Sequence, residues 1–121
     1  MAVYIMTDSE QRLADILWEV CPIPSGQLVQ VCWERLEWKK STTYTVLRKI
    51  CQMGIFQNIN TIVSPCMSRE DYNCKKGEKY LEENYQGSLP AFVAAYMERR
   101  KLSAKDVKAL EALLATRQKR K

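Results

Sequence analysis

The sequence predicts a mainly α-helical protein with one small β-hairpin. Apolar residues recur at helical spacing in several segments, and a Ser or Thr stands three residues before an acidic residue at positions 7, 68 and 103. The run Thr61-Ile-Val-Ser64 is rich in β-branched residues and predicts strand instead. With 121 residues, 46% hydrophobic and 27% charged, the chain can bury one ordinary core, with a small extension for oligomerisation.

The first helix is predicted to begin at Thr7, because Thr7-Asp-Ser-Glu10 is a capping-box pattern in which each end satisfies a free backbone amide. The helix is expected to end at Cys21-Pro-Ile-Pro24, since proline interrupts helices. Ser25 is well placed to cap a second helix that closes near Trp38. The apolar stripes of these two helices are Leu13, Ile16, Leu17 and Val20, then Leu28, Val31, Cys32 and Leu36.

A third helix is expected directly after Lys39 and Lys40, and it should stop at Gly54, which can adopt the left-handed conformation that ends helices. Its apolar face follows the spacing i, i+3, i+4, i+7 at Thr43, Val46, Leu47 and Ile50. A second face carries hydroxyls and a guanidinium but no carboxylate, at Ser41, Tyr44, Thr45 and Arg48. Two helices joined by so short a turn predict a helix-turn-helix whose second helix binds DNA.

Two short antiparallel strands are predicted after Gly54, with a turn between Asn58 and Thr61. A hairpin at this place would be a wing. Residues 1–70 are therefore expected to form a winged helix-turn-helix DNA-binding domain.

Residues 71–121 are expected to form a helical dimerisation domain. Capping signals at Ser68 and Ser103 and a break at Gln86-Gly-Ser88 divide this region into two or three amphipathic helices with no core of their own. Such helices commonly bury their apolar faces in a symmetric homodimer, which would also supply the second half-site contact of a DNA-binding protein. The candidate dimerisation residues are Leu89, Phe92, Val93, Tyr96, Leu110 and Leu113.

The DNA-contacting roles can be divided by residue type. Ser41, Tyr44 and Thr45 are candidates for reading base edges, because the N-terminal half of a recognition helix reaches them. For Tyr44 the alternative is a ring resting on the domain surface. The candidates for neutralising phosphates are Lys39, Lys40, Arg48 and Lys49, and the alternative for all four is a solvated face.

Charge and cysteine content limit the kinds of partner and site that the protein can have. The net charge of +5 and a pI near 9.0 favour an anionic partner. Five cysteines without a C-x-x-C pair, and no histidine, make a zinc site or a disulfide framework improbable. No catalytic residue, metal or cofactor is expected, because no set of side chains assembles an active site. No apolar run is long enough to span a bilayer and no signal peptide is recognisable, so we expect a cytoplasmic protein without a membrane partner.

The run Trp38-x-x-x-Thr42-x-x-Thr45-x-Leu47-x-Lys49-Ile50-x-x-Met53-Gly54 resembles the motif of the penicillinase and methicillin-resistance repressors, the BlaI/MecI/CopY family. Further segments resemble that family in register, and the resemblance covers nearly the whole chain. They are Glu10 to Trp18, Ser64 to Tyr72, Phe92 to Tyr96 and Leu110 to Leu114. The resemblance implies a homodimeric repressor on a double-stranded, pseudo-palindromic DNA operator, with Thr42 placed at the DNA backbone.

The resemblance also implies regulation by a sensor-linked protease. The motif-matched bond in this chain is Ala95-Tyr96, where relatives that are cut carry Asn-Phe. The C-terminal cysteine cluster of copper-responsive relatives is absent, and Lys49 and Met53 replace the usual arginine and lysine. The wing lacks the usual Gly-Arg tip. These departures leave a second hypothesis open, a winged-helix adaptor that binds protein and not DNA.

Overall fold

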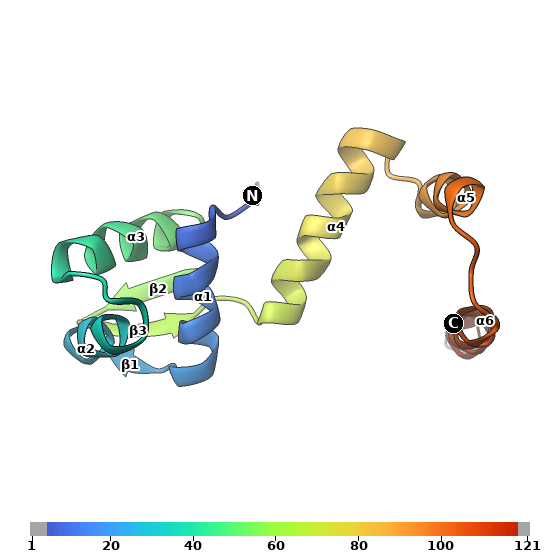
Figure 1. Cartoon of the computed structure of the whole chain (residues 1–121). Coiled ribbons are helices and arrows are strands. Elements are labelled where there is room, and N and C mark those ends of the chain that lie inside the picture. Colours follow the sequence, from blue (N-terminus) through green and yellow to red (C-terminus); the bar gives the residue numbers. More distant parts are fainter. Residues whose placement is uncertain (1–4, 119–121) are drawn as a thin grey trace. The chain divides into compact units, whose positions relative to one another are not determined.

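The structure, a computed structural model, describes residues 5–118 and confirms the predicted fold class (Figure 1). Within these residues the chain forms six helices and a small three-stranded antiparallel sheet. It divides into two compact units, Met1–Tyr80 and Leu81–Lys121, each of which is described by itself below. The division falls inside one helix, C-terminal to the boundary expected near residue 70.

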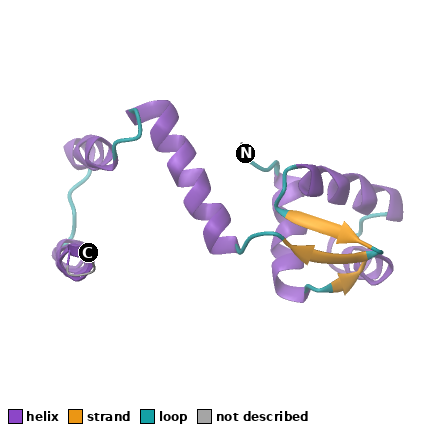
Figure 2. Cartoon of the chain, turned by 180° about the vertical axis from the view of Figure 1, so that it is seen from behind, coloured by secondary structure: helices purple, strands orange, loops and turns teal. Residues whose placement is uncertain are grey.

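The first unit is a winged helix. Its elements are α1 (Asp8–Val20), β1 (Ile23–Pro24), α2 (Ser25–Leu36), α3 (Lys40–Gln52), β2 (Phe56–Ile59), β3 (Ile62–Pro65) and the first part of α4 (Arg69–Tyr85). The strands lie in the order β1-β3-β2, and the helices pack on one face of the sheet (Figure 2). The hairpin is confirmed, with its turn at Asn60 and Thr61.

Strand β1 was not predicted. Ile23 pairs with Val63 and Pro24 with Ile62, which adds a third strand to the wing hairpin. The sequence indicates only a break after the first helix here, because two residues are too few to show strand alternation. Ile23 is buried at 7% exposure, so the short strand also closes one edge of the core.

The core of the first unit consists of the predicted apolar stripes together with residues of the sheet. Leu13, Leu17, Leu28 and Ile50 are fully buried, as is Val63 on β3. Each such side chain contributes about 1.5–3 kcal/mol by leaving water. Phe56 and Tyr72, both within 1% of full burial, pack against Trp18 with ring centroids 5.3 and 5.9 Å away.

Most predicted helix ends are confirmed. The Glu10 amide donates to Thr7 Oγ1 at 3.3 Å, and the Thr7 amide donates to Glu10 Oε1 at 2.9 Å, which completes the capping box. Gly54 has φ of 80° at the end of α3, in the left-handed region. Ser68 Oγ accepts from the Asp71 amide at 3.0 Å at the start of α4.

The predicted cap of the second helix is wrong, whereas the helix ends near Trp38 as predicted. Pro24 occupies the N-cap of α2 and makes no side-chain cap bond, whereas Ser25 is the first helical residue and is buried. The Ser25 backbone amide donates to the Thr61 carbonyl in the wing at 2.8 Å. The helix ends at Leu36, where Glu37 turns left-handed with φ of 57°, so the chain leaves it before Trp38.

The second unit contains the end of α4, then α5 (Leu89–Arg99) and α6 (Ala104–Gln118). The predicted break is present, with positive φ at Gln86 and Gly87 and a cap bond from the Ala91 amide to Ser88 Oγ at 3.1 Å. No residue of α5 is buried, and the large apolar side chains of α6 are exposed. None of the helices within residues 5–118 combines the length and the apolar character needed to cross a membrane.

Candidate nucleic-acid interface

Helix α3 separates a buried face from a polar exposed face. Thr43, Val46, Leu47 and Ile50 are buried, and the Thr43 hydroxyl is satisfied by the Lys39 carbonyl at 3.3 Å. The exposed residues on α3 and directly before it include seven of the eight predicted DNA-contacting side chains: Lys39, Lys40, Ser41, Thr42, Thr45, Arg48 and Lys49. The eighth, Tyr44, is half-buried. The fold therefore presents nearly the whole predicted set on one helix and its entry.

The start of α3 is held in place by the turn that precedes it. Trp38 is half-buried against the core, and its backbone amide donates to the Cys32 carbonyl at 3.3 Å. Lys39 is the N-cap of α3 and makes no side-chain cap bond. Lys39 and Lys40 therefore flank a helix start that is positively polarised and has no side-chain acceptor of its own.

The electrostatic character of this surface is positive. No Asp or Glu occurs between Glu37 and Glu70, a stretch that contains α3 and the wing, whereas the exposed Glu37 stands in the turn between α2 and α3. The cations in the same stretch are Lys39, Lys40, Arg48, Lys49 and Arg69. A surface with this balance attracts phosphates and repels acidic partners.

Thr45 lies on the exposed face with a hydroxyl that already has a partner. Its Oγ1 donates to the Ser41 carbonyl, one turn earlier, at 2.8 Å. A hydroxyl can rotate, and it can accept as well as donate a hydrogen bond. Thr45 and Ser41 can therefore bond to hydrogen-bond donors or to acceptors on the base edges. Their chemistry suits direct readout, but it does not select one base.

Tyr44 points its hydroxyl toward α2. The Tyr44 hydroxyl donates to Ser25 Oγ at 3.3 Å, and the Ser25 amide donates to the Thr61 carbonyl in the wing turn. Ser25 thus joins three elements, α2, α3 and the wing. No sequence pattern indicates this connection, because the residues are far apart and Ser25 matches the pattern of a helix cap.

Lys49 lies at the far end of the same helix. It lines a shallow hollow of about 350 Å³ together with Gln52, Glu10 and two apolar residues, Ile5 and Met53. Glu10 is the N3 residue of the α1 capping box, so its carboxylate has a structural role in capping α1. Lys49 therefore lines this hollow together with a carboxylate.

The wing offers amides and apolar groups but no charge. Residues 54–68 contain no charged side chain. Ile59 and Ile62 face each other across the hairpin and are 56% and 41% exposed. Gln57 Nε2 donates to Ser64 Oγ at 3.1 Å on the neighbouring strand. The wing cannot neutralise phosphates, although it can hydrogen-bond and make apolar contacts.

The start of α2 is a feature that the sequence interpretation missed. Because Pro24 makes no side-chain cap bond, the first turn of α2 keeps backbone amides without a side-chain acceptor. Gly26 and Gln27 in this turn are exposed, and Tyr44 ties it to α3. A helix N-terminus of this kind suits a phosphate oxygen.

The predicted dimerisation residues meet in part within the second unit. Phe92, Val93, Tyr96 and Leu110 line an open, mainly apolar groove of about 330 Å³ between α5 and α6. Leu89 and Leu113 do not line it, and they are 57% and 55% exposed. The Ala95-Tyr96 bond lies inside α5, where the Tyr96 carbonyl accepts from the Arg100 amide at 2.9 Å.

The cysteines form no metal-ligand set in the part of the chain that the structure describes. No group of three His, Cys, Asp or Glu side chains lies close enough there to hold an ion. Burial, and secondarily Cys51, raises the pKa of the Cys21 thiol to about 11. Burial likewise raises the pKa of the Cys32 and Cys51 thiols, so these three side chains behave as small apolar groups at neutral pH.

Comparison with known proteins agrees with this geometry. Residues 6–116 match the family model described as penicillinase repressor. The chain is also similar to the penicillinase repressor of Bacillus licheniformis, at 21% identity over 120 residues, which cover 96% of this chain and 94% of that protein.

Proposed function

The chain belongs to the penicillinase repressor family, the BlaI/MecI/CopY family of transcriptional repressors, and on that premise we propose that it binds a pseudo-palindromic DNA operator as a homodimer. The observation that carries the proposal is the exposed face of α3, which holds cations and hydroxyls and no carboxylate. In this proposal α3 enters the major groove as the recognition helix.

Base reading falls to the N-terminal half of α3. Ser41 and Thr45 are exposed on adjacent turns and have hydroxyls that donate or accept. Tyr44 lies between them and can place the edge of its ring near a thymine methyl, while its hydroxyl remains with Ser25. These three residues are the ones that contact base edges in this proposal.

Phosphate binding sets the register of the helix in the groove. Lys39, Lys40 and Arg48 carry the charge, Thr42 donates a hydroxyl, and Lys49 contributes less because Glu10 lines the same hollow. The free amides in the first turn of α2 bind a further phosphate. Such contacts strengthen binding to all DNA alike.

Dimerisation uses the groove between α5 and α6. A chain whose second unit exposes Tyr96, Leu110 and neighbouring apolar side chains gains stability when a second copy covers them. A two-fold dimer would place two recognition helices on the two halves of the operator.

Inactivation is proposed to occur by cleavage of the Ala95-Tyr96 bond by a sensor-linked protease. Both residues lie within α5 beside the dimer groove, so a cut there would remove residues that the dimer needs. Because proteases bind extended backbone, α5 must unwind locally before the bond is cut. Repression would then be relieved through loss of the dimer.

Substitution of Thr45 tests the proposal at its base-reading step. Thr45→Ala should reduce discrimination between a duplex selected from a random pool and random DNA by about 1–3 kcal/mol. Thr116→Ala is a matched control, because Thr116 Oγ1 makes the same bond to the carbonyl one turn earlier, at 2.9 Å, on α6. Equal discrimination between selected and random DNA by both variants would show that Thr45 does not read a base.

The uncharged wing favours one alternative function. Exposed Ile59 and Ile62 without neighbouring cations would suit a protein surface, as in a winged-helix adaptor that does not bind DNA. The adaptor predicts binding that depends little on salt. DNA binding instead predicts an affinity that falls steeply as salt rises, so a salt titration separates the two functions.

A further inference from the structure

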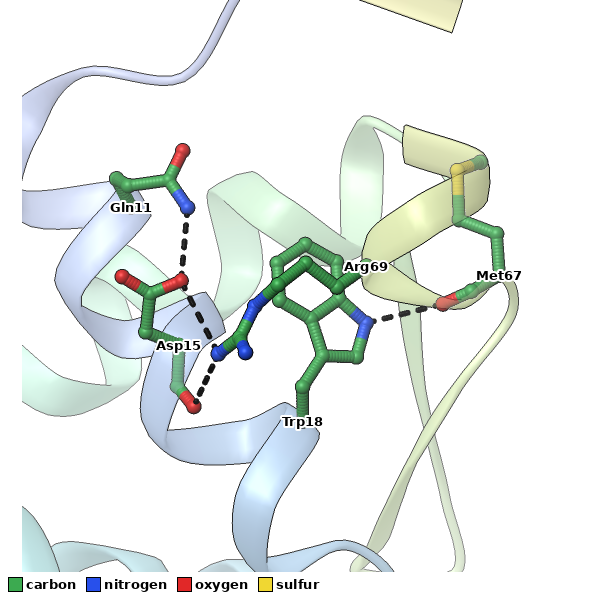
Figure 3. Close-up of polar contacts among 5 residues, drawn as sticks. All are labelled: Gln11, Asp15, Trp18, Met67 and Arg69. Atoms are coloured by element: carbon green, nitrogen blue, oxygen red, sulfur yellow. Dashed lines mark hydrogen bonds and ion pairs between the residues drawn. The ribbon is translucent and has the colours of Figure 1, made fainter. Parts of the chain in front are cut away.

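Helix α4 begins as part of the first unit. Tyr72 is fully buried in the core, and its hydroxyl oxygen accepts from the Met6 amide at 3.0 Å. Arg69 lies 5.4 Å above the Trp18 ring and bonds Asp15 Oδ1 at 3.4 Å, while Trp18 Nε1 donates to the Met67 carbonyl (Figure 3). The first turn of α4 is therefore fixed to α1.

The chain then passes into the second unit within the same helix. Lys76 lies 5.1 Å from the centroid of the Tyr72 ring, and the next residue is Gly77. The division between the two units follows at Tyr80 and Leu81. In the second unit, the Leu81 carbonyl accepts from the Gly87 amide at 2.9 Å, which ties the end of α4 to the turn before α5.

Gly77 is the central residue of this helix of 17 residues. A Cβ at this position would meet no atom within 4 Å, so packing in the chain does not require glycine. Glycine nevertheless weakens a helix interior, because it has the most backbone freedom to lose and offers no side chain to shield the helical bonds. The helix thus has its weakest intrinsic position between its anchored start and the second unit.

We propose that Gly77 is the bending point of α4 and determines how widely the half-site spacing of an operator can vary. The inference rests on the proposed dimeric DNA binding. When the helical bonds around Gly77 open transiently, the first unit can turn on its DNA half-site while the dimerised second unit stays intact. A stiffer α4 would hold one spacing and reject others.

Hydrogen exchange on the full chain without DNA tests the bending point directly. Gly77→Ala should slow amide exchange in the turns around residue 77 about fivefold, the ratio that corresponds to the helix propensities of the two residues. Asn73→Ala is the matched control, since it places alanine at an exposed position in the anchored part of the same helix. Its exchange around residue 77 should equal that of the wild type. Unchanged exchange in Gly77→Ala would overturn the proposal.

A second experiment measures DNA binding. It uses a duplex that the wild-type chain selects from a random pool, and derivatives of it in which one or two base pairs are added or removed between the half-sites. Gly77→Ala should bind the selected spacing and a single half-site as the wild type does. It should bind the altered spacings at least fivefold more weakly than the wild type, while Asn73→Ala keeps the wild-type profile. The same spacing profile in all three proteins would overturn the role of Gly77.

The two experiments also distinguish a failure of this proposal from a failure of the proposed operator binding. If the wild-type chain selects no duplex over random DNA, operator binding fails and the spacing role fails with it. If the wild type selects a two-part site but Gly77→Ala shows no narrowing, operator binding stands and only the bending point is lost. Sedimentation of the variants confirms that each remains in the wild-type oligomeric state.

Discussion

The hydroxyl of Tyr44 donates a hydrogen bond to Ser25 Oγ across 3.3 Å, which joins the exposed helix α3 to the first turn of α2. Ser25 is only 5% exposed, and its amide reaches the Thr61 carbonyl in the wing. One small buried residue therefore fixes α3, α2 and the wing turn relative to one another.

This connection predicts non-additive substitutions. Tyr44→Phe and Ser25→Ala should each lower the free energy of unfolding by about 0.5–1.5 kcal/mol, because each removes one partner of the same bond. The double variant should lose less than the sum of the two losses, as measured by denaturant unfolding. Strictly additive losses would show that the two side chains do not interact.

The burial of Tyr72 predicts a loss of stability at high pH. Burial raises the pKa of the Tyr72 hydroxyl above its usual 10.0, as does the negative charge of Glu10, while the bond from the Met6 amide lowers it. Since the folded state favours the neutral phenol, this stabilisation is complete below pH 10 and declines as the pH rises through the folded pKa. Tyr72→Phe should be less stable than the wild type at pH 8.

Denaturant unfolding from pH 8 to pH 11 measures that effect. The difference in unfolding free energy between the wild type and Tyr72→Phe should shrink as the pH rises, whereas groups common to both proteins cancel. A constant difference over this range would contradict the assignment. The phenylalanine variant is itself the control, because it keeps the ring contact with Trp18 and removes only the hydroxyl.

The apolar groove of the second unit predicts that dimerisation depends on its lining. Phe92→Glu and Val93→Glu should each produce monomers, because a carboxylate in a buried apolar interface is costly to desolvate. Ala94→Glu is the control, since Ala94 is exposed on α5 and does not line the groove. Analytical ultracentrifugation distinguishes the outcomes, and a dimer that survives both groove variants would move the interface elsewhere.

The sequence predicted those parts of the fold whose signals are local. Capping pairs such as Thr7 with Glu10, and stripes such as that of α3, depend on residues three or four positions apart. The winged-helix class follows from their order. The exposed set on α3 was predicted for the same reason, because one helical repeat decides both its buried and its exposed face.

The remaining features depend on residues that are distant in sequence. Strand β1 exists because Ile23 and Pro24 pair with β3, and a segment of two residues carries no periodic signal. Tyr72 falls within residues 71–121, the expected dimerisation domain, yet its ring fills the first core beside Trp18. Ser25 matched a cap pattern but became a buried link to the wing, because the tertiary contact outweighed the local preference.

We expect the exposed, carboxylate-free face of α3 to bind DNA through its phosphates, and the salt dependence of Arg48→Ala binding tests this claim. Fluorescence anisotropy with a selected duplex should show log affinity falling linearly with log salt for the wild type. Arg48→Ala should reduce that slope by about 0.9 and weaken selected and random DNA alike. Lys105→Ala, which removes a positive charge from an exposed position on α6, should leave the slope unchanged. An Arg48→Ala slope equal to that of the wild type would contradict the claim.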